Sequence, residues 1–194
     1  MAGLFAAAEQ VLLDDASGRI DYVPSLLDAG FAQAAFVALR DGARWKSERR
    51  QMYAREVDVP RLLGSYKLAD AALPPVIATI HEAVRARVDA PFDSVGLNLY
   101  RDERDSVAPH NDHLYEIAEG QPIALVSLGA AREMVIRAKA PPRRVLRIEL
   151  EPGSLLLMSY ATQLHYDHGI PKQKHPVGPR ISLAFRVKGG AGRY

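Results

Sequence analysis

Apolar residues recur at helical spacing in the first half of the chain. Between Ser25 and Asp41 they follow a period close to 3.6 among many alanines, and Pro24 precedes them. The same spacing returns between Pro74 and Val88, where two prolines open the segment. These two stretches predict amphipathic helices, with a short strand-like run around Trp45 between them.

The period changes to two after Ser94. Val95, Leu97 and Leu99 alternate with smaller or polar residues, as in a strand with one buried face. Glycine and proline clusters separate the strand-like runs that follow. These runs are Ile123–Leu128, Met134–Arg137, Val145–Leu150, Ser154–Met158 and Ile181–Val187. The pattern predicts a mainly β, α+β fold in which short strands form a sandwich, jelly roll or barrel and helices lie in the N-terminal part.

Length and composition narrow the classes of protein. A chain of 194 residues, 48% hydrophobic and without an evident repeat or linker, suits one folded domain. We expect helical support in residues 1–92, a β-core in 93–188 and a tail in 189–194. The absence of cysteine excludes disulfides and thiolate ligands, so that any metal is held by nitrogen and oxygen.

Charge and hydropathy bear on the expected partners and location of the protein. The formal net charge of +2 is too small to establish a nucleic-acid partner. No apolar run is long enough to cross a bilayer, and the first residues have no basic stretch typical of a signal peptide. We therefore expect a monomer in the cytoplasm, without a membrane partner.

One short motif carries metal chemistry. His110 and Asp112 are two positions apart, so on a strand their side chains point to the same face. A second histidine at His165 or His168 completes two imidazoles and one carboxylate, and the sequence alone does not choose between them. This donor set binds one face of Fe(II) and leaves the other positions open for a cosubstrate and O₂.

Two arginines on the last strand indicate an anion site. Arg180, Ser182 and Arg186 share one face of that strand, and apolar neighbours alternate with them. Asn98 and Tyr100 share a face by the same rule. Because an unpaired buried cation is costly, these arginines need an anion, and a small dicarboxylate such as 2-oxoglutarate fits.

Each motif also has a structural interpretation without chemistry. A surface turn produces His-x-Asp, a lone histidine is often structural, and arginines six positions apart often lie on a solvated strand. The order, spacing and strand context of all three together favour a metal site. A non-catalytic β-barrel binding domain with structural histidines is the alternative.

The C-terminal half resembles the AlkB family of Fe(II)/2-oxoglutarate-dependent dioxygenases, in particular its branch that repairs alkylated nucleic acids. The segments that carry the resemblance are Asn98-Leu99-Tyr100, His110-Asn111-Asp112, Ser127-Leu128-Gly129, Arg132 to Arg137, Gly153 to Leu156, Tyr166-Asp167-His168-Gly169-Ile170-Pro171 and Arg180 to Arg186. The resemblance implies a double-stranded β-helix, or jelly roll, and favours His168 over His165. The resemblance also implies a substrate lid within residues 1–92, but upstream only Trp45 and Val59-Pro60-Arg61 match, and loosely.

The resemblance also implies roles for the site residues. His110, Asp112 and His168 would hold Fe(II). Asn98 and Arg186 would address the C1 end of 2-oxoglutarate, while its C5 carboxylate would bind a second set of side chains: Tyr100, Arg180 and Ser182. With O₂, such an enzyme oxidises an N-methyl group of DNA or RNA and releases formaldehyde, succinate and CO₂.

The substrate side departs from the family pattern. Leu114 stands where repair enzymes often carry an acidic residue, and the next acid downstream is Glu116. Basic residues between Arg40 and Lys67 are interleaved with three aromatic residues suited to stacking on a base, namely Trp45, Tyr53 and Tyr66. A solvated charged face explains the same basic residues, and an oxygenase acting on a protein or small molecule is the alternative function.

Overall fold

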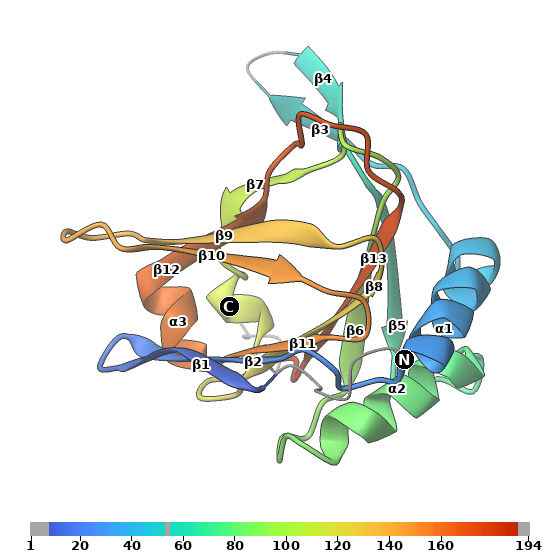
Figure 1. The fold of residues 1–194 in the computed structure, drawn as a ribbon, viewed down its shortest axis with the longest axis horizontal. Helices are drawn as coiled ribbons and strands as arrows, with labels where there is room; N and C mark the ends of the chain where they lie inside the picture. The colour runs from blue at the N-terminus through green and yellow to red at the C-terminus, as the bar shows by residue number, and fades with distance from the viewer. Residues whose placement is uncertain (1–7, 53–54, 190–194) are drawn as a thin grey trace, which may run out of the picture.

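Two antiparallel sheets form the body of the computed structural model, which describes residues 8–52 and 55–189. Among these residues, the major sheet has the order β1 (Gln10–Asp15), β2 (Gly18–Val23), β11 (Leu155–Met158), β8 (Ile123–Gly129), β13 (Arg180–Arg186), β6 (Ser94–Tyr100) and β5 (Leu62–Lys67). The minor sheet has the order β10 (Val145–Leu150), β9 (Arg132–Ala138), β12 (Tyr166–Ile170) and β7 (Val107–His110). A separate hairpin of β3 (Arg49–Met52) and β4 (Arg55–Asp58) projects from the body (Figure 1).

Helices cover one face of the major sheet and the minor sheet covers the other (Figure 1). Helix α1 (Ala29–Gly42) begins after Asp28, whose carboxylate accepts the Phe31 N–H as an N-cap. Helix α2 (Pro75–Arg85) opens with a proline in its first turn and buries Ile77, Ile80 and Val84. Both predicted helices are therefore present, although α1 starts four residues later than Ser25 because the cap fixes its first turn.

The alternation on β13 divides the interior into two cores. Ile181, Leu183 and Phe185 lie in the core between the major sheet and the helices. Ala184 belongs to the second core, between the two sheets, and Arg180 and Ser182 line a pocket on that side. The period of two predicted this division, and it directs the polar side chains of β13 towards the minor sheet.

The mainly β prediction is confirmed, but the N-terminal part is less helical than expected. Residues before Ser94 supply β1, β2 and β5 to the major sheet, in addition to the two helices. Leu13, Ile20 and Tyr22 are buried against the second core. The β1–β2 strands are short and charged on their outer face, so their period of two is weak in the sequence. Within the described part of the chain, no helix is long and apolar enough to cross a membrane.

Candidate active site

Two histidines face each other across neighbouring strands of the minor sheet. His110 ends β7, and His168 is its direct partner on β12, with ring centroids 4.6 Å apart. The Nδ1 atom of His110 lies 2.9 Å from the carbonyl oxygen of Ala108, which can only accept a hydrogen bond. Nδ1 therefore donates in this contact, which makes Nε2 the ring nitrogen that is available to a metal.

Asp112 completes the site from the segment after β7. One donor atom from each of His110, Asp112 and His168 lies within 4.8 Å of the others. We expected His110 and Asp112 on one strand, but β7 ends at His110, so irregular backbone presents the carboxylate. The structure brings His168 to His110 and Asp112, whereas His165 is exposed at the end of helix α3 (Tyr160–His165).

The electrostatics suit a cation. Burial is the main cause that lowers the pKa of His168 to about 4, so its imidazole is neutral near pH 7. Burial alone would raise the pKa of Asp112, but the Arg186 guanidinium outweighs it and holds that pKa below the usual value of 3.8. The site therefore presents a neutral imidazole at His168 and a carboxylate at Asp112 beside the ring of His110.

A pocket extends from the histidines between the two sheets, and the predicted cosubstrate residues line it. Arg180 pairs with Tyr100, and Ser182 with Asn98, in the register of β13 and β6. These four side chains line the pocket together with Arg186. Apolar side chains close its other walls, namely Val107, Leu125, Met134, Ile170 and Ala184.

Arg180 is the side chain in this pocket that most strongly favours the binding of an anion. It is fully buried, and its Nη2 donates to the Ser127 hydroxyl at 2.8 Å. Its Nε and Nη1 atoms have no hydrogen-bond partner, and its Cζ atom lies 5.3 Å from the centroid of the Tyr100 ring. Burial lowers the pKa of Arg180 to about 10, so it remains charged at pH 7. A carboxylate satisfies both the charge and the two donors.

Three residues in or beside the site have no role predicted from the sequence, namely Arg61, Arg132 and Gln163. Arg61 lines it and donates to the Asn98 side-chain oxygen at 2.8 Å. Arg132 is fully buried, and its guanidinium donates to the carbonyl oxygens of Asp102, Asp105 and Pro171. Gln163 accepts the backbone N–H of Asp112. Arg61 and Arg132 lie within quoted motifs, but their contacts depend on register and loops that sequence spacing does not give.

The predicted substrate residues are not gathered at the pocket. Trp45 packs on the helical core and donates to the carbonyl oxygens of Leu39 and Arg40, and Tyr66 is buried with its hydroxyl bonded to the Arg44 N–H. Both rings are used by the scaffold. Leu114 and Glu116 lie in the short 3₁₀ helix η1 (Leu114–Glu116) after Asp112, while Tyr53 lies outside the described residues.

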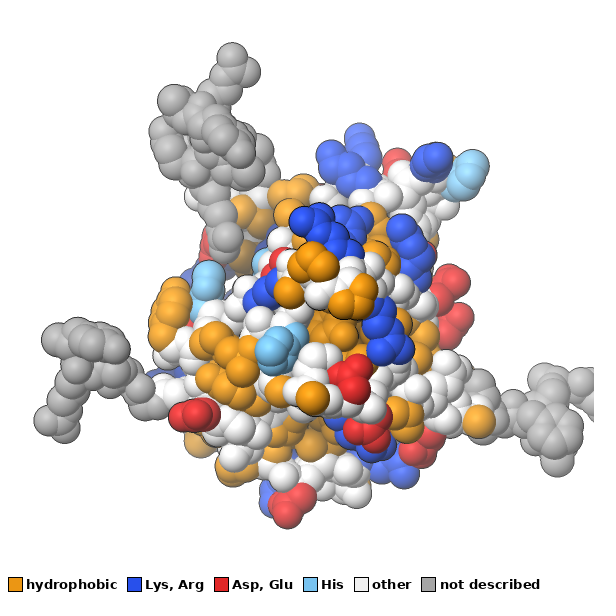
Figure 2. Space-filling model, turned by 90° about the vertical axis from the view of Figure 1, so that its left-hand side faces the viewer, with side chains coloured by type: hydrophobic (Ala, Val, Ile, Leu, Met, Phe, Trp, Pro, Cys, Tyr) orange, Lys and Arg blue, Asp and Glu red, His pale blue; other side chains and the backbone are white. Residues whose placement is uncertain are grey.

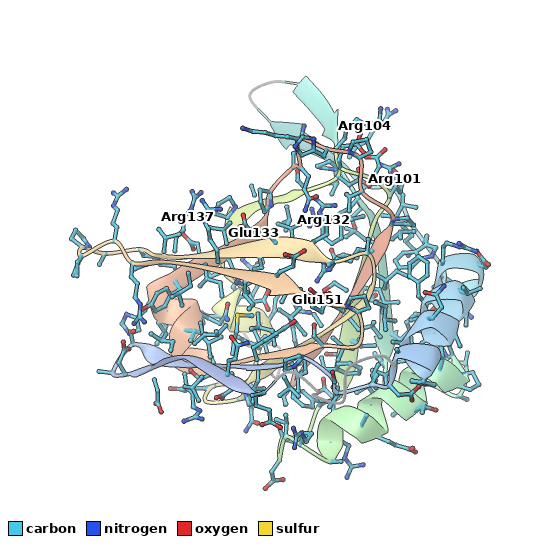
Figure 3. The ribbon with its side chains drawn as sticks, viewed as in Figure 1. Arg101, Arg104, Arg132, Glu133, Arg137 and Glu151 are labelled. Atoms are coloured by element: carbon cyan, nitrogen blue, oxygen red, sulfur yellow. The ribbon has the colours of Figure 1, made fainter. Side chains whose placement is uncertain are left out.

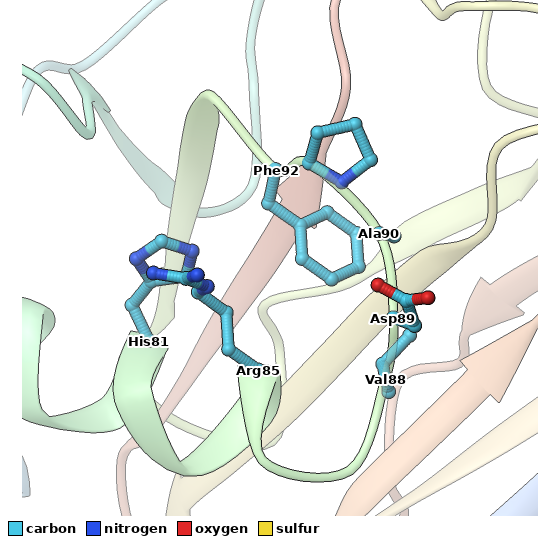
Figure 4. Close-up of a pocket in the computed structure, with 7 residues that line it drawn as sticks. His81, Arg85, Val88, Asp89, Ala90 and Phe92 are labelled. Carbon is cyan, nitrogen blue, oxygen red and sulfur yellow. The ribbon is translucent and has the colours of Figure 1, made fainter.

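A second hollow lies elsewhere, at the C-terminal end of α2 (Figure 4). His81 and Arg85 line it from the helix, and Val88 to Phe92 line it from the loop that leads to β6. The His81 ring stacks on Phe185, on the helical face of β13. None of the predicted site residues lines this hollow.

A comparison with known protein families gives a match that is consistent with an Fe(II) site and an anion-binding arginine. The 2OG-Fe(II) oxygenase superfamily matches residues 61–186. The chain belongs to this superfamily. The donor set of this oxygenase fits Fe(II), and the unpartnered Arg180 nitrogens fit a carboxylate of 2-oxoglutarate.

Curated relatives support the AlkB resemblance. The oxygenase is 40% identical over 119 residues to human DNA oxidative demethylase ALKBH2, covering 58% of this chain and 46% of that protein. It is 36% identical over 121 residues to human alpha-ketoglutarate-dependent dioxygenase alkB homolog 3, covering 58% and 42% of the two chains. The aligned region thus spans less than half the length of either relative.

Solved structures support the fold. The alpha-ketoglutarate-dependent epimerase SnoN from nogalamycin biosynthesis superposes with a TM-score of 0.61 at 17% identity, covering 90% of this chain and 82% of that one. OsALKBH1 superposes with a TM-score of 0.59 at 13% identity, covering 92% and 100% of the two chains. These matches confirm the predicted jelly-roll core.

Proposed function

We propose that this oxygenase is an Fe(II)/2-oxoglutarate-dependent oxidative demethylase of N-alkylated bases in DNA or RNA. The observation that carries the proposal is the joining of the His110–Asp112–His168 triad to the anion pocket of Arg180. Two of the relatives that share this part of the chain bear the names of a DNA oxidative demethylase and an alkB homolog. Both observations concern the catalytic core. The identity of the substrate base therefore needs a direct test.

In such a reaction, different residues of the site would have different roles. Bound Fe(II), with 2-oxoglutarate and O₂, supplies the oxidation of an N-methyl C–H bond, after which the hydroxymethyl group leaves as formaldehyde. Arg180 and Ser182 hold the far carboxylate of the cosubstrate, and Asn98 and Arg186 orient its other end. The apolar wall of Val107, Leu125, Met134 and Ile170 limits water around it.

Basic side chains on the surface could contact the phosphates of a nucleic-acid strand. Figure 2 shows the face of the protein that lies on the left in Figure 1, and Lys and Arg side chains gather over its upper part. Arg137, on β9, has no ion pair with a described acid, and the exposed Lys172 and Lys174 follow β12 without one either. Arg101 and Arg104, near the upper loops in Figure 3, pair with Asp105 and Asp102. The unpaired cations are the better candidates for phosphate contact.

We also propose that part of residues 1–92 acts as a substrate lid. The backbone of the β3–β4 hairpin supports this because it projects from the body of the protein (Figure 1). A monomeric state and a cytoplasmic location remain predictions.

The test is the conversion of a methylated oligonucleotide. We expect the wild-type protein, loaded with Fe(II) and 2-oxoglutarate and then exposed to air, to remove one methyl mass from 1-methyladenine or 3-methylcytosine. Formaldehyde and succinate should form in matching amounts, and Asp112→Ala should form neither. Succinate without a change in oligonucleotide mass would overturn the nucleic-acid proposal and favour a protein or small-molecule substrate.

A further inference from the structure

The metal-binding carboxylate lies outside the sheet that holds its partners. His110 and His168 are fixed by the ladder between β7 and β12. Asp112 comes two residues after β7 ends and precedes η1, so no strand pairing fixes its backbone. Its placement must therefore depend on side chains from other elements.

Two side chains from other elements supply this support, in addition to the neighbouring Asn111, whose Nδ2 donates to the Asp112 carbonyl oxygen at 2.9 Å. Arg186, on β13, binds both carboxylate oxygens of Asp112. Gln163, on α3, accepts the Asp112 backbone N–H through Oε1 at 3.0 Å, and only 1% of the Gln163 surface is exposed. Arg186 thus holds the charged end and Gln163 holds the peptide group from which the side chain starts.

A directional chain of hydrogen bonds fixes the orientation of the Gln163 amide. The Ser159 carbonyl can only accept, so the Thr162 hydroxyl, 2.6 Å away, donates to it. That hydroxyl is then an acceptor for Gln163 Nε2 at 3.3 Å, which turns Oε1 towards the Asp112 N–H. Thr162 is also buried, so water does not compete for these bonds.

The helix that carries Gln163 is anchored by Lys139, which directly follows β9. The Lys139 ammonium donates to the Gln163 carbonyl oxygen at 2.7 Å, and the Lys139 N–H donates to the His165 carbonyl oxygen. The chain then continues directly into β12, which carries His168. A displacement of α3 would therefore reach two of the three metal ligands.

We propose that Gln163 is a positioning residue of the metal centre, which holds the Asp112 peptide so that its carboxylate faces the two imidazoles. Thr162 sets the orientation of the Gln163 amide. This inference concerns the metal triad alone and does not depend on the nature of the substrate.

The test compares Ni(II) affinity by calorimetric titration, without O₂ or nucleic acid. Ni(II) binds imidazole strongly enough for affinity to be measured when the carboxylate is lost. Gln163→Met keeps a similar length but removes the acceptor, and we expect about a tenfold weaker affinity. Gln33→Met, on the exposed face of α1, is the matched control and should bind as the wild type does. Thr162→Val, which leaves the amide free to turn, should give a smaller loss.

A double variant separates positioning from general loosening of the fold. In an Asp112→Ala background the ligand is gone, so Gln163→Met should have no further effect on Ni(II) affinity. An equal loss in both backgrounds would overturn the proposal, as would an affinity within twofold of the Gln33→Met control. If Gln163→Met does not fold, Thr162→Val decides in the same two backgrounds, and an unchanged affinity overturns the proposal.

Discussion

Asp112 and Arg186 are 74 positions apart in the chain, yet they form a two-point ion pair. Arg186 Nε lies 2.8 Å from Asp112 Oδ2, and Nη2 lies 3.1 Å from Oδ1. The pair joins β13, in the major sheet, to the segment that follows β7 of the minor sheet. It therefore ties the cosubstrate side of the pocket to the metal triad.

Replacing Arg186 by lysine should weaken metal binding. Lysine retains the charge but not the planar fork, so the carboxylate loses one of its two fixed contacts. We expect about a tenfold lower Mn(II) affinity, measured by paramagnetic resonance titration. Arg147→Lys is the control, because Arg147 pairs with Glu133 through side chains that are 57% and 38% exposed, and neither residue lines the pocket. Equal affinities of the two variants would contradict the role given to the ion pair.

Replacing Arg180 by methionine should have opposite effects on binding and on stability. Loss of the charged donors should weaken 2-oxoglutarate binding by about 10–100-fold, since such bonds contribute ~1.5–3 kcal/mol. The ligand-free protein should be as stable as the wild type or up to ~2 kcal/mol more stable, because a buried cation without an anion is removed. Calorimetric titration and urea unfolding measure the two effects. Unchanged 2-oxoglutarate affinity would remove Arg180 from the anion site.

The neutral His168 predicts a pH dependence of the metal-free protein. Above pH 6.5 this imidazole is neutral in both the folded and unfolded states. As the pH falls from 6.5 to about 4, the unfolded chain takes up a proton that the folded protein does not, so stability decreases. The total loss is on the order of 3 kcal/mol. The effect of Asp112 appears below pH 3.8, because its folded pKa is lowered, so the two windows are distinct.

Urea unfolding with a chelator present, repeated across this range, checks the prediction. His168→Gln should flatten the decrease between pH 6.5 and 4, whereas the exposed His175→Gln should retain it. A decrease of the same size in His168→Gln would assign the pH dependence to other groups.

Gly169 lets the two histidine strands approach. On β7, Ala108 and Pro109 together lie opposite Gly169, which makes a bulge between the His110–His168 and Val107–Ile170 pairs. A Cβ atom at Gly169 would lie 2.8 Å from the Val107 carbonyl oxygen and 3.0 Å from the Pro109 nitrogen. Both are backbone atoms, so β7 would have to move away from β12 and separate the ligands.

Gly169→Ala should therefore lower both thermal stability and Ni(II) affinity. The expected destabilisation is about 1–3 kcal/mol. Gly42→Ala is the control, because no heavy atom outside its chain neighbours and the backbone of its own helix lies within 4 Å of the added Cβ, and alanine favours the helix. Calorimetry measures both quantities, and a Gly169→Ala protein with wild-type affinity would contradict this role for the bulge.

The sequence predicted those parts of the site that depend on periodicity. Alternation on β13 and β6 placed Arg180, Ser182, Asn98 and Tyr100 on one face, and the structure has them in one pocket. The resemblance to the AlkB family favoured His168, and the structure brings a donor atom of His168 within 4.8 Å of those of His110 and Asp112. These features follow from positions along single strands, which spacing determines.

Features that depend on packing between distant segments were beyond the sequence. The side-chain bonds of Arg61 to Asn98 and of Gln163 to Asp112 cross between elements far apart in the chain. Trp45 and Tyr66 have the composition of a stacking surface, but both pack in the scaffold. Aromatic residues serve cores and ligands equally well, so composition alone does not distinguish these uses.

The most direct test of the account is an anaerobic titration of the Fe(II)-loaded protein with 2-oxoglutarate, following the visible charge-transfer absorption that a 2-oxo acid gives when it chelates Fe(II). We predict a saturable band at one equivalent per chain. The band should be absent in Asp112→Ala and should require more 2-oxoglutarate in Arg180→Met. Stoichiometric Fe(II) binding without such a band, or an unchanged titration in both variants, would contradict the assignment of the triad and its pocket.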